Sequence, residues 1–431
     1  MTRWMRLFAA CFCLQLAVVE PFGSASAQER ADVEAEPLPD APRPTYDLLY
    51  DVRLAPSERA AHVRMRVKSE TPRVKSVRLR IDPNRHYDFR GDGEIEKLDG
   101  AILWRPPPTG GSLRWGFRID HLRDAASYDA RCAEKWALFR GGDLVPAARV
   151  VTEDLAHSNA RLRLRLPEGW TAVLPYERAA DGRYQIEHEH RRFDRPTGWW
   201  VLGHLGVLRE RIAGTSVAVA GPVQQGLRRH DILALLRWTL PALRDAVGSL
   251  PERLLVVGAG DPMWRGGLSG PRSVFVHADR PLMTHDLTSP VLHELMHTVL
   301  GIRSGPGGDW IVEGLAELYS LELLVRSKTV SRRRYRKALQ RLAREGADVP
   351  ILDVQRASGD VTARAVTVLH ALDQELERGS DEELGLDEVL VRIAAKRAPL
   401  TTVRFRELVE EVAGRSLRSW FREQVPVKGE Y

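Results

Sequence analysis

Apolar and polar positions alternate with a period of two from residue 46 to residue 210. The stretch "HVRMRVKS" places Val63, Met65 and Val67 on one face and arginines on the other, and "VRLRI", "LRWGFRI" and "RLRLRL" repeat the pattern. Turn-forming stretches such as "RGDG" and "LPEGW" separate these runs. The alternation is typical of antiparallel strands with one solvent-exposed face. We therefore predict an antiparallel β domain over residues 46–210.

The apolar period becomes helical in the second half of the chain. The stretch "RHDILALLRWTLPALRDAVG" predicts a helix with a kink at Pro241, and "RLLVVGAG" and "RSVFVHA" predict strands. From Ser289 to the end, helical patterns dominate and are interrupted at glycines. The predicted fold class is therefore α+β, in which the N-terminal β domain is followed by a mostly helical domain over residues 211–431.

The first 45 residues are not expected to belong to the fold. A basic start, "MTRWMR", precedes the apolar run "LFAACFCLQLAVV" and a small-residue site at Ala25 and Ala27. This order predicts a signal peptide over residues 1–27, cleaved before Gln28, and a periplasmic or secreted protein. Residues 28–45 are rich in proline and acidic residues, which predicts a flexible tether. No internal apolar run is long enough to span a bilayer, so we expect no stable membrane insertion.

Charge and cysteine content indicate which partners the protein binds and in which cellular compartment it folds. The chain has 64 Lys and Arg against 58 Asp and Glu, a formal net charge of +6. The arginines are spread along the sequence, so we interpret them as solvated faces and expect no nucleic-acid partner. Cleavage before Gln28 would leave Cys132 as the remaining cysteine, so the core rather than a disulfide must hold the fold. This composition fits a bacterial periplasm and gives no indication of the oligomeric state.

The segment "SPVLHELMHTVLG" holds the strongest chemical signal. Ser289 is a good N-cap, Pro290 suits the first helical position and Gly301 suits the position past the end. On such a helix His293 and His297 are one turn apart, so both imidazoles can reach one Zn²⁺ ion. The motif is HExxH, in which Glu294 would accept a proton from the water that the metal activates. Two histidines on a helix are also often just polar residues on its surface.

A second helix strengthens the metal interpretation. Asp309 is expected to cap "WIVEGLAELYSLELL", on which Glu313 and Glu317 share one face. Glu313 would complete a His₂Glu site for one zinc ion per chain, with a fourth position open for catalysis. Glu317 could accept a hydrogen bond from the outer nitrogen of a ligating histidine. The alternative for Glu317 is a solvated helix face.

These residues resemble the gluzincin zinc metallopeptidases, in particular the glycyl-aminopeptidase family, relatives of aminopeptidase N. The likeness rests on "HELMH" followed by "WIVEGLAEL" and extends to "WRGGLSGPRSVFV", "VTVLHALDQELERG", "FRELVEEVAGRSLRSWFREQV", "LRLRLPEGW" and "RPTGWWVLG". The resemblance implies a thermolysin-like catalytic domain that cleaves peptide or protein substrates. It also implies that "SGPRSVFVHA" is an edge strand, to which an extended peptide can add.

The sequence departs from this family at two functional positions. The family's amine-binding glutamate is replaced by Ser269, and its oxyanion-stabilising tyrosine aligns with Thr362. Loss of one hydrogen-bond donor to the oxyanion typically lowers the turnover rate by a factor of ~10²–10³. Arg364 and His370 on the same predicted helix are the remaining candidates for charge stabilisation. The alternatives are a solvated arginine and a packed histidine.

Two functions are consistent with these residues. One is an exported, zinc-dependent peptidase with Glu294 as its general base. The other is a gluzincin-fold protein that binds zinc and peptide but has weak or no catalytic activity. The intact set of His293, Glu294, His297 and Glu313 favours the enzyme, whereas the residues at 269 and 362 favour the binding protein.

Overall fold

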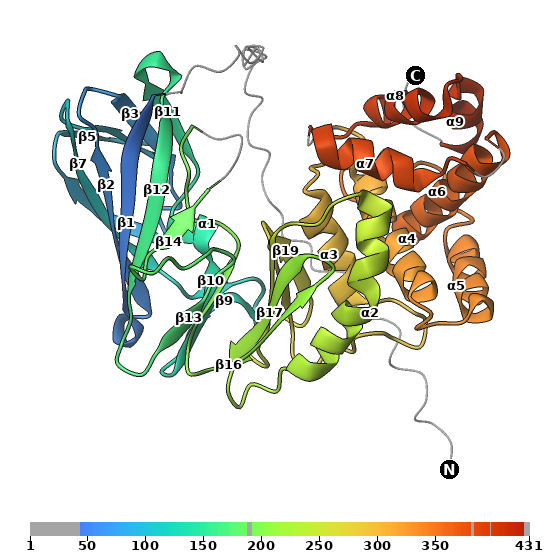
Figure 1. Ribbon diagram of the computed structural model, residues 1–431, viewed down its shortest axis with the longest axis horizontal. Helices are drawn as coiled ribbons and strands as arrows, with labels where there is room; N and C mark the ends of the chain where they lie inside the picture. Colours follow the sequence, from blue (N-terminus) through green and yellow to red (C-terminus); the bar gives the residue numbers. More distant parts are fainter. Residues whose placement is uncertain (1–43, 188–191, 381–382, 397, 426–431) are drawn as a thin grey trace. The chain divides into compact units, whose positions relative to one another are not determined.

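The computed structural model describes residues 44–187, 192–380, 383–396 and 398–425. The predicted signal peptide and all but the last two residues of the predicted tether lie outside these ranges. Strands make up most of the chain as far as residue 222, and helices make up most of the remainder (Figure 1). The predicted α+β class, with a β-rich part followed by a mostly helical part, is confirmed.

A six-stranded sheet contains the clearest alternation in the sequence. Val63, Met65 and Val67 are buried on one face, at 2%, 0% and 3% exposure, as predicted. The neighbouring strands β1 and β12 are parallel, so the prediction of a wholly antiparallel domain was wrong at this point. In spatial order the strands are β14 (Tyr184–Ile186), β12 (His157–Arg165), β1 (Thr45–Ala55), β2 (Ala60–Lys68), β7 (Gly110–Arg118) and β4 (His86–Gly91).

Two smaller antiparallel sheets and three short helical turns complete the β-rich part. One sheet has the order β13 (Thr171–Val173), β15 (Trp199–Gly203), β10 (Trp136–Arg140), β9 (Tyr128–Cys132) and β8 (His121–Leu122). The other has the order β11 (Ala148–Thr152), β3 (Val74–Arg80), β6 (Ala101–Arg105) and β5 (Glu94–Leu98). The helical turns are η1 (Pro56–Glu58), α1 (Gly141–Leu144) and η2 (Glu153–Leu155).

A fourth, mixed sheet lies against the helix that carries the two histidines. Its order is β16 (Leu205–Ile212), β17 (Thr215–Pro222), β18 (Arg253–Val257), β20 (Ser273–Val276) and β19 (Gly267–Gly270). Of the predicted edge strand "SGPRSVFVHA", residues 269–270 end β19, whereas residues 273–276 form β20, which is paired on both sides, so the prediction was wrong for β20. The edge is β19, because the chain turns back after residue 270 and inserts β20 between β19 and β18. The predicted domain boundary after residue 210 falls inside β16, and the division into two domains stays a prediction.

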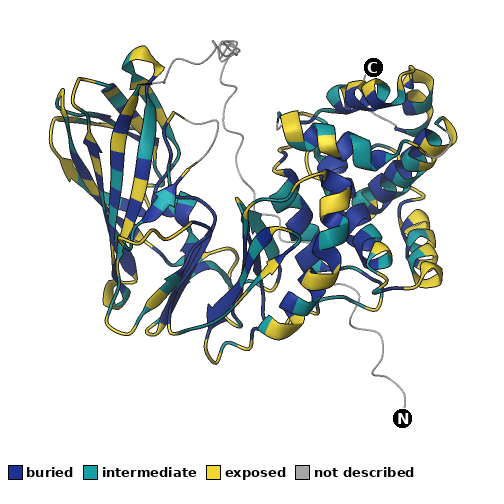
Figure 2. Ribbon diagram, in the orientation of Figure 1, coloured by how far each residue is buried: buried dark blue, intermediate teal, exposed yellow. Residues whose placement is uncertain are grey.

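The helical part is built around one helix that is almost fully buried. Figure 2 shows α4 mostly buried and α5 mostly exposed. Trp310 and Tyr319 lie within α4 at 0% and 1% exposure. The helices are α2 (Arg229–Val247), α3 (Pro290–Leu300), α4 (Asp309–Arg326), α5 (Arg332–Glu345), α6 (Asp360–Arg378), α7 (Leu386–Lys396), α8 (Thr402–Ala413) and α9 (Arg418–Gln424). Among the described helices, none has both the length and the apolarity needed to cross a membrane.

Candidate metal centre

Helix α3 begins and ends where local sequence signals predict. The hydroxyl of Ser289 accepts a hydrogen bond from the N–H of Leu292 at 3.4 Å, and Pro290 is the first helical residue. Gly301 adopts a left-handed conformation with φ of 59°, and its N–H donates to the carbonyl of His297. Both termini are therefore fixed by residues suited to those positions. The two histidines lie on successive turns between them.

Helix α4 begins differently from the prediction. Its N-cap is Gly308, and Asp309 is its first residue, so the predicted Asp309 cap was wrong. The carboxylate of Asp309 instead accepts a hydrogen bond from the N–H of Ala357 at 2.7 Å. A tertiary partner has therefore replaced the local capping bond, and it ties the segment before α6 to the start of α4. Glu313 follows one turn later on α4.

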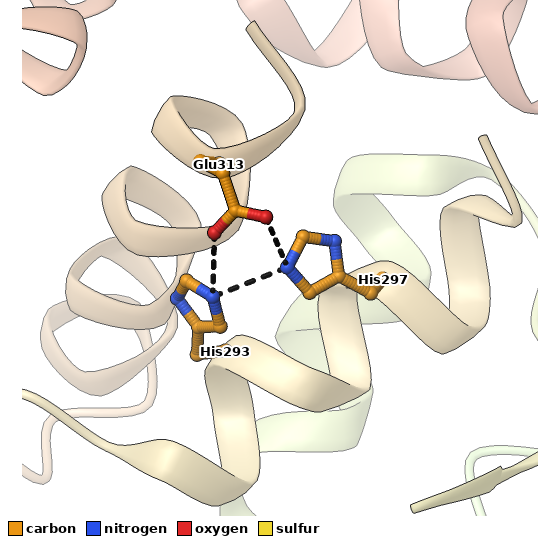
Figure 3. Close-up of side chains that lie close together, drawn as sticks. All are labelled: His293, His297 and Glu313. Atoms are coloured by element: carbon orange, nitrogen blue, oxygen red, sulfur yellow. Dashed lines mark hydrogen bonds and ion pairs between the residues drawn. The ribbon is translucent and has the colours of Figure 1, made fainter. Parts of the chain in front are cut away.

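The side chains of His293, His297 and Glu313 meet in one cluster (Figure 3). The Nε2 atoms of the two histidines are 3.1 Å apart. One oxygen of Glu313 lies 3.3 Å from Nε2 of His293, and the other lies 3.5 Å from Nε2 of His297. Ligands about 2.0–2.1 Å from a tetrahedral zinc ion are ~3.3 Å from one another. The three side chains therefore fit a zinc ion without rearrangement.

Electrostatic interactions in the cluster favour a positive charge at its centre. Burial lowers the pKa of His293, but the Glu313 and Glu317 carboxylates oppose this effect and raise that pKa to about 10. Burial raises the pKa of Glu313, but the two imidazoles beside it outweigh this effect and hold that pKa well below its usual range. The protein without metal thus holds a proton among these groups. A divalent cation would satisfy the same carboxylate and both nitrogens.

Glu317 contacts the far side of the first histidine. Its Oε2 atom is 3.1 Å from Nδ1 of His293, the ring nitrogen that faces away from the cluster. Glu317 is 8% exposed, so its carboxylate is shielded from water. A carboxylate at this position fixes the tautomer in which Nδ1 carries the proton and Nε2 is free to bind a metal.

Glu294 and Ser269 lie at the same face of the edge strand β19. A Cβ atom on Gly267 would be 2.7 Å from Cγ of Glu294, so the first residue of β19 faces this glutamate. Ser269 is two residues further along β19 and therefore shares that face. Among the described residues, no hydrogen bond or ion pair engages the Glu294 carboxylate. That carboxylate acts electrostatically on His293, which places it close to the cluster.

Among the described residues, no hydrogen bond, ion pair or ring contact links the three candidates on α6 to the cluster. Thr362 is one turn before Ala365, which packs against Gly314 of α4, so Thr362 lies one turn from a contact between α6 and α4. Arg364 packs against Gly346, and its Nε atom is buried without a hydrogen-bond partner. His370 instead stacks edge-on against the Tyr335 ring, 6.4 Å away between centroids.

Comparison with known proteins identifies the fold. No family model matches the sequence, and no curated protein matches it. The structure is similar to an aminopeptidase N family protein from Idiomarina loihiensis, with a TM-score of 0.66 and 12% identity over 89% of this chain and 76% of that one. It is also similar to an M1 zinc metallopeptidase from Deinococcus radiodurans, with a TM-score of 0.56 and 17% identity over 88% of this chain and 93% of that one. A mutant of that metallopeptidase gives a TM-score of 0.57 and 15% identity over 90% and 94% of the two chains.

The chain has the fold of the M1 zinc metallopeptidases. The predicted likeness to gluzincins related to aminopeptidase N is therefore confirmed at the level of the fold. The histidine–histidine–glutamate cluster lies within this M1 fold on α3 and α4.

Proposed function

We propose that the protein is a zinc-dependent peptidase in which His293, His297 and Glu313 hold one zinc ion. The observation that carries the proposal is the geometry of the cluster, with Glu294 on the same helix and the edge strand β19 beside it. The alternative, a zinc- and peptide-binding protein with weak or no turnover, is favoured by Ser269 and by the threonine at position 362, where the resembling family has its oxyanion-stabilising tyrosine. The hydroxyls of Tyr319 and Tyr335 on the neighbouring helices α4 and α5 instead donate hydrogen bonds to Asp387 and Glu322, which are not part of the cluster.

The chain's own residues supply a base and a binding surface. Zinc, when bound, acts as a Lewis acid that polarises a carbonyl and lowers the pKa of water. Glu294 takes the proton from the attacking water and passes it to the nitrogen of the leaving amine. The free main-chain groups of β19 pair with an extended peptide, which aligns its scissile bond with Glu294. Glu317 holds the His293 ring through Nδ1.

The first test is zinc content together with peptide-library digestion by the purified protein. We expect about one zinc per chain and zinc-dependent cleavage that a chelator abolishes. A protein that holds zinc and binds peptides without cleaving them would support the alternative. A protein without zinc would refute both functions.

N-terminally acetylated peptides should be cleaved at least as well as free ones. Ser269 carries no charge at the position where the resembling aminopeptidases have a glutamate that binds the substrate's ammonium group. A free amine therefore gains little over an amide, and we expect an endopeptidase or a relaxed peptidase. The measurement is the ratio of kcat/KM for one peptide with and without the acetyl group. A loss of a hundredfold or more on acetylation, about 3 kcal/mol, would mean that another group binds the amine.

We also propose that the protein is exported after cleavage before Gln28. The proposal is supported by the order of the basic, apolar and small-residue segments at the N-terminus. N-terminal sequencing of protein from the periplasmic fraction should begin at Gln28. Full-length chain in the cytoplasm would contradict export, and membrane-bound chain acylated at Cys11 would identify a lipoprotein instead.

A further inference from the structure

The excess positive charge of the chain is concentrated on one helix. Helix α5 has seven basic residues against one acidic residue, Glu345, which gives it a net charge of +6. The formal net charge of the whole chain is also +6, so the charges outside α5 cancel one another. Five of the six residues from 332 to 337 are arginine or lysine. This helix is therefore the exception to the even spread of basic residues along the rest of the sequence.

Most of the cations on α5 face solvent without a carboxylate partner, and the helix is mostly exposed (Figure 2). Among the described residues, Arg341 is the one basic residue of α5 with an ion pair, which it forms with Glu345 at 2.6 Å. Arg334 and Arg344 donate to main-chain carbonyl groups, which carry no net charge. The exposed basic residues are Arg332, Arg333, Arg334, Arg336, Lys337 and Arg344.

This arrangement is unfavourable for the helix itself. Arg332 is four residues before Arg336, so the two side chains are neighbours on the helix surface, and Lys337 follows Arg333 at the same spacing. Like charges at this spacing destabilise a helix. The cations of the first turn also lie at the positive end of the helix dipole. Residues that break local rules in this way are expected at functional sites, where a bound partner offsets the penalty.

Two of these arginines line a cavity of about 560 Å³ between α4 and α5. The lining residues are Glu322, Val325 and Arg326 of α4 and Arg332, Tyr335 and Arg336 of α5. Glu322, the one acidic residue of this lining, accepts a hydrogen bond from Tyr335 and pairs with Arg326 at 3.2 Å. Arg332 and Arg336 therefore line a cavity whose acid is already engaged, and their guanidinium groups keep donors for an external anion.

The exposed face of α5 offers charge and little else. Its apolar residues Ala338 and Leu342 are turned into the core at 5% exposure each, and none of the large exposed apolar side chains among the described residues lies on α5. Its one aromatic residue, Tyr335, is half-buried and bound to Glu322. A protein partner typically needs an apolar centre to the contact, and single-stranded nucleic acid needs rings on which bases stack. A surface of anionic headgroups needs neither.

We propose that α5 binds a membrane surface of anionic phospholipid, with the phosphate of one headgroup held by Arg332 and Arg336 in the cavity beside α4. Clusters of about four to eight basic residues on an amphipathic helix are typical of proteins that bind such surfaces. Guanidinium groups suit a phosphate because they bind it with paired hydrogen bonds. The apolar side of α5 is packed inside the protein, so the contact stays at the headgroups and is reversible. The proposal goes beyond the peptidase function and does not depend on it.

The test is co-sedimentation of the protein with lipid vesicles. The chain from Gln28 onward is used, so that the apolar segment before it cannot contribute to binding. One set of vesicles contains equal parts of phosphatidylglycerol and phosphatidylcholine, and the other contains phosphatidylcholine alone. The protein should sediment with the anionic vesicles at low salt and stay in solution with the neutral ones. Binding to the anionic vesicles should fall as salt is raised.

Two double variants separate the cavity from the rest of α5. Each cation near an anionic surface strengthens binding by about fivefold, so Arg333→Gln with Lys337→Gln should weaken it by about 25-fold. Arg332→Gln with Arg336→Gln removes the same charge and also the phosphate contacts in the cavity. This second variant should therefore weaken binding by on the order of a hundredfold.

The matched control is Arg53→Gln with Arg66→Gln, which removes two exposed cations from β1 and β2 and should change vesicle binding by less than about twofold. Zinc content and peptide cleavage should be unchanged in all of these double variants, because none of them alters the metal centre. Glu294→Gln protein should bind vesicles as the original protein does. Loss of the peptidase function would therefore leave the membrane site standing, and the reverse also holds.

Equal binding to anionic and neutral vesicles would overturn the proposal, as would absence of binding to both at low salt. An equal loss in the control and in the variants of α5 would overturn it as well. Tighter binding to a single-stranded DNA oligonucleotide than to the anionic vesicles, lost in the variants of α5, would identify a nucleic-acid partner instead. A loss in Arg332→Gln with Arg336→Gln no larger than in Arg333→Gln with Lys337→Gln would refute the headgroup site in the cavity.

Discussion

Replacement of His297 by alanine is expected to remove both the metal and the hydrolysis of peptides. His297 supplies one of the three atoms that converge within 4.8 Å of one another. Without it, one imidazole and one carboxylate remain, and two protein ligands hold zinc far more weakly than three. Zinc measured by mass spectrometry after dialysis should fall from about one per chain to a small fraction of that. Peptide cleavage should fall in proportion.

The matched control for this variant is His285→Ala. The His285 side chain is 90% exposed and lies before α3, so its loss changes the histidine count without touching the cluster. Zinc content and cleavage should stay at the original level. Full zinc in His297→Ala would show that the metal, if any, is held elsewhere. A circular dichroism spectrum unchanged from the original protein would show that α3 is still folded.

The sequence predicts α3 well because the signals that define it are local. The Ser289 cap, Pro290 and Gly301 act within one turn of the residues that they position, so no distant contact can override them easily. The spacing of the two histidines then follows from the helix itself. The contact between α3 and α4 depends on segments that are not local in the sequence. Only a small set of residue types can complete a zinc site, however, and the glutamate at Glu313 is one of these types.

The predictions that failed depend on contacts between distant segments. Asp309 does not cap α4, because Ala357 offers its carboxylate a tertiary partner. The edge of the fourth sheet was assigned to the wrong strand, because strand order depends on where the chain turns back after Gly270. The parallel pairing of β1 with β12 likewise joins segments about a hundred residues apart, and alternation alone carries no information on direction.

Glu294→Gln should abolish most turnover while leaving the metal in place. The substitution keeps the size of the side chain beside Gly267 but removes the group that accepts a proton. A positioned general base contributes about 10²–10⁴ to the rate, so kcat should fall by a factor in this range. Glu294 is not one of the clustered ligands, so zinc content should stay near that of the original protein. The measurement is kcat on one peptide, with zinc determined on the same sample.

The control is Glu407→Gln, an exposed glutamate on α8, which should change neither quantity. The comparison separates the two functions because each predicts a different response. In a peptidase, Glu294→Gln loses turnover while peptide affinity persists, since binding relies on β19 and not on the base. In a binding protein, turnover is negligible before the substitution and the substitution changes nothing measurable. Full turnover in the variant would mean that another group accepts the proton, and the role assigned to Glu294 would be wrong.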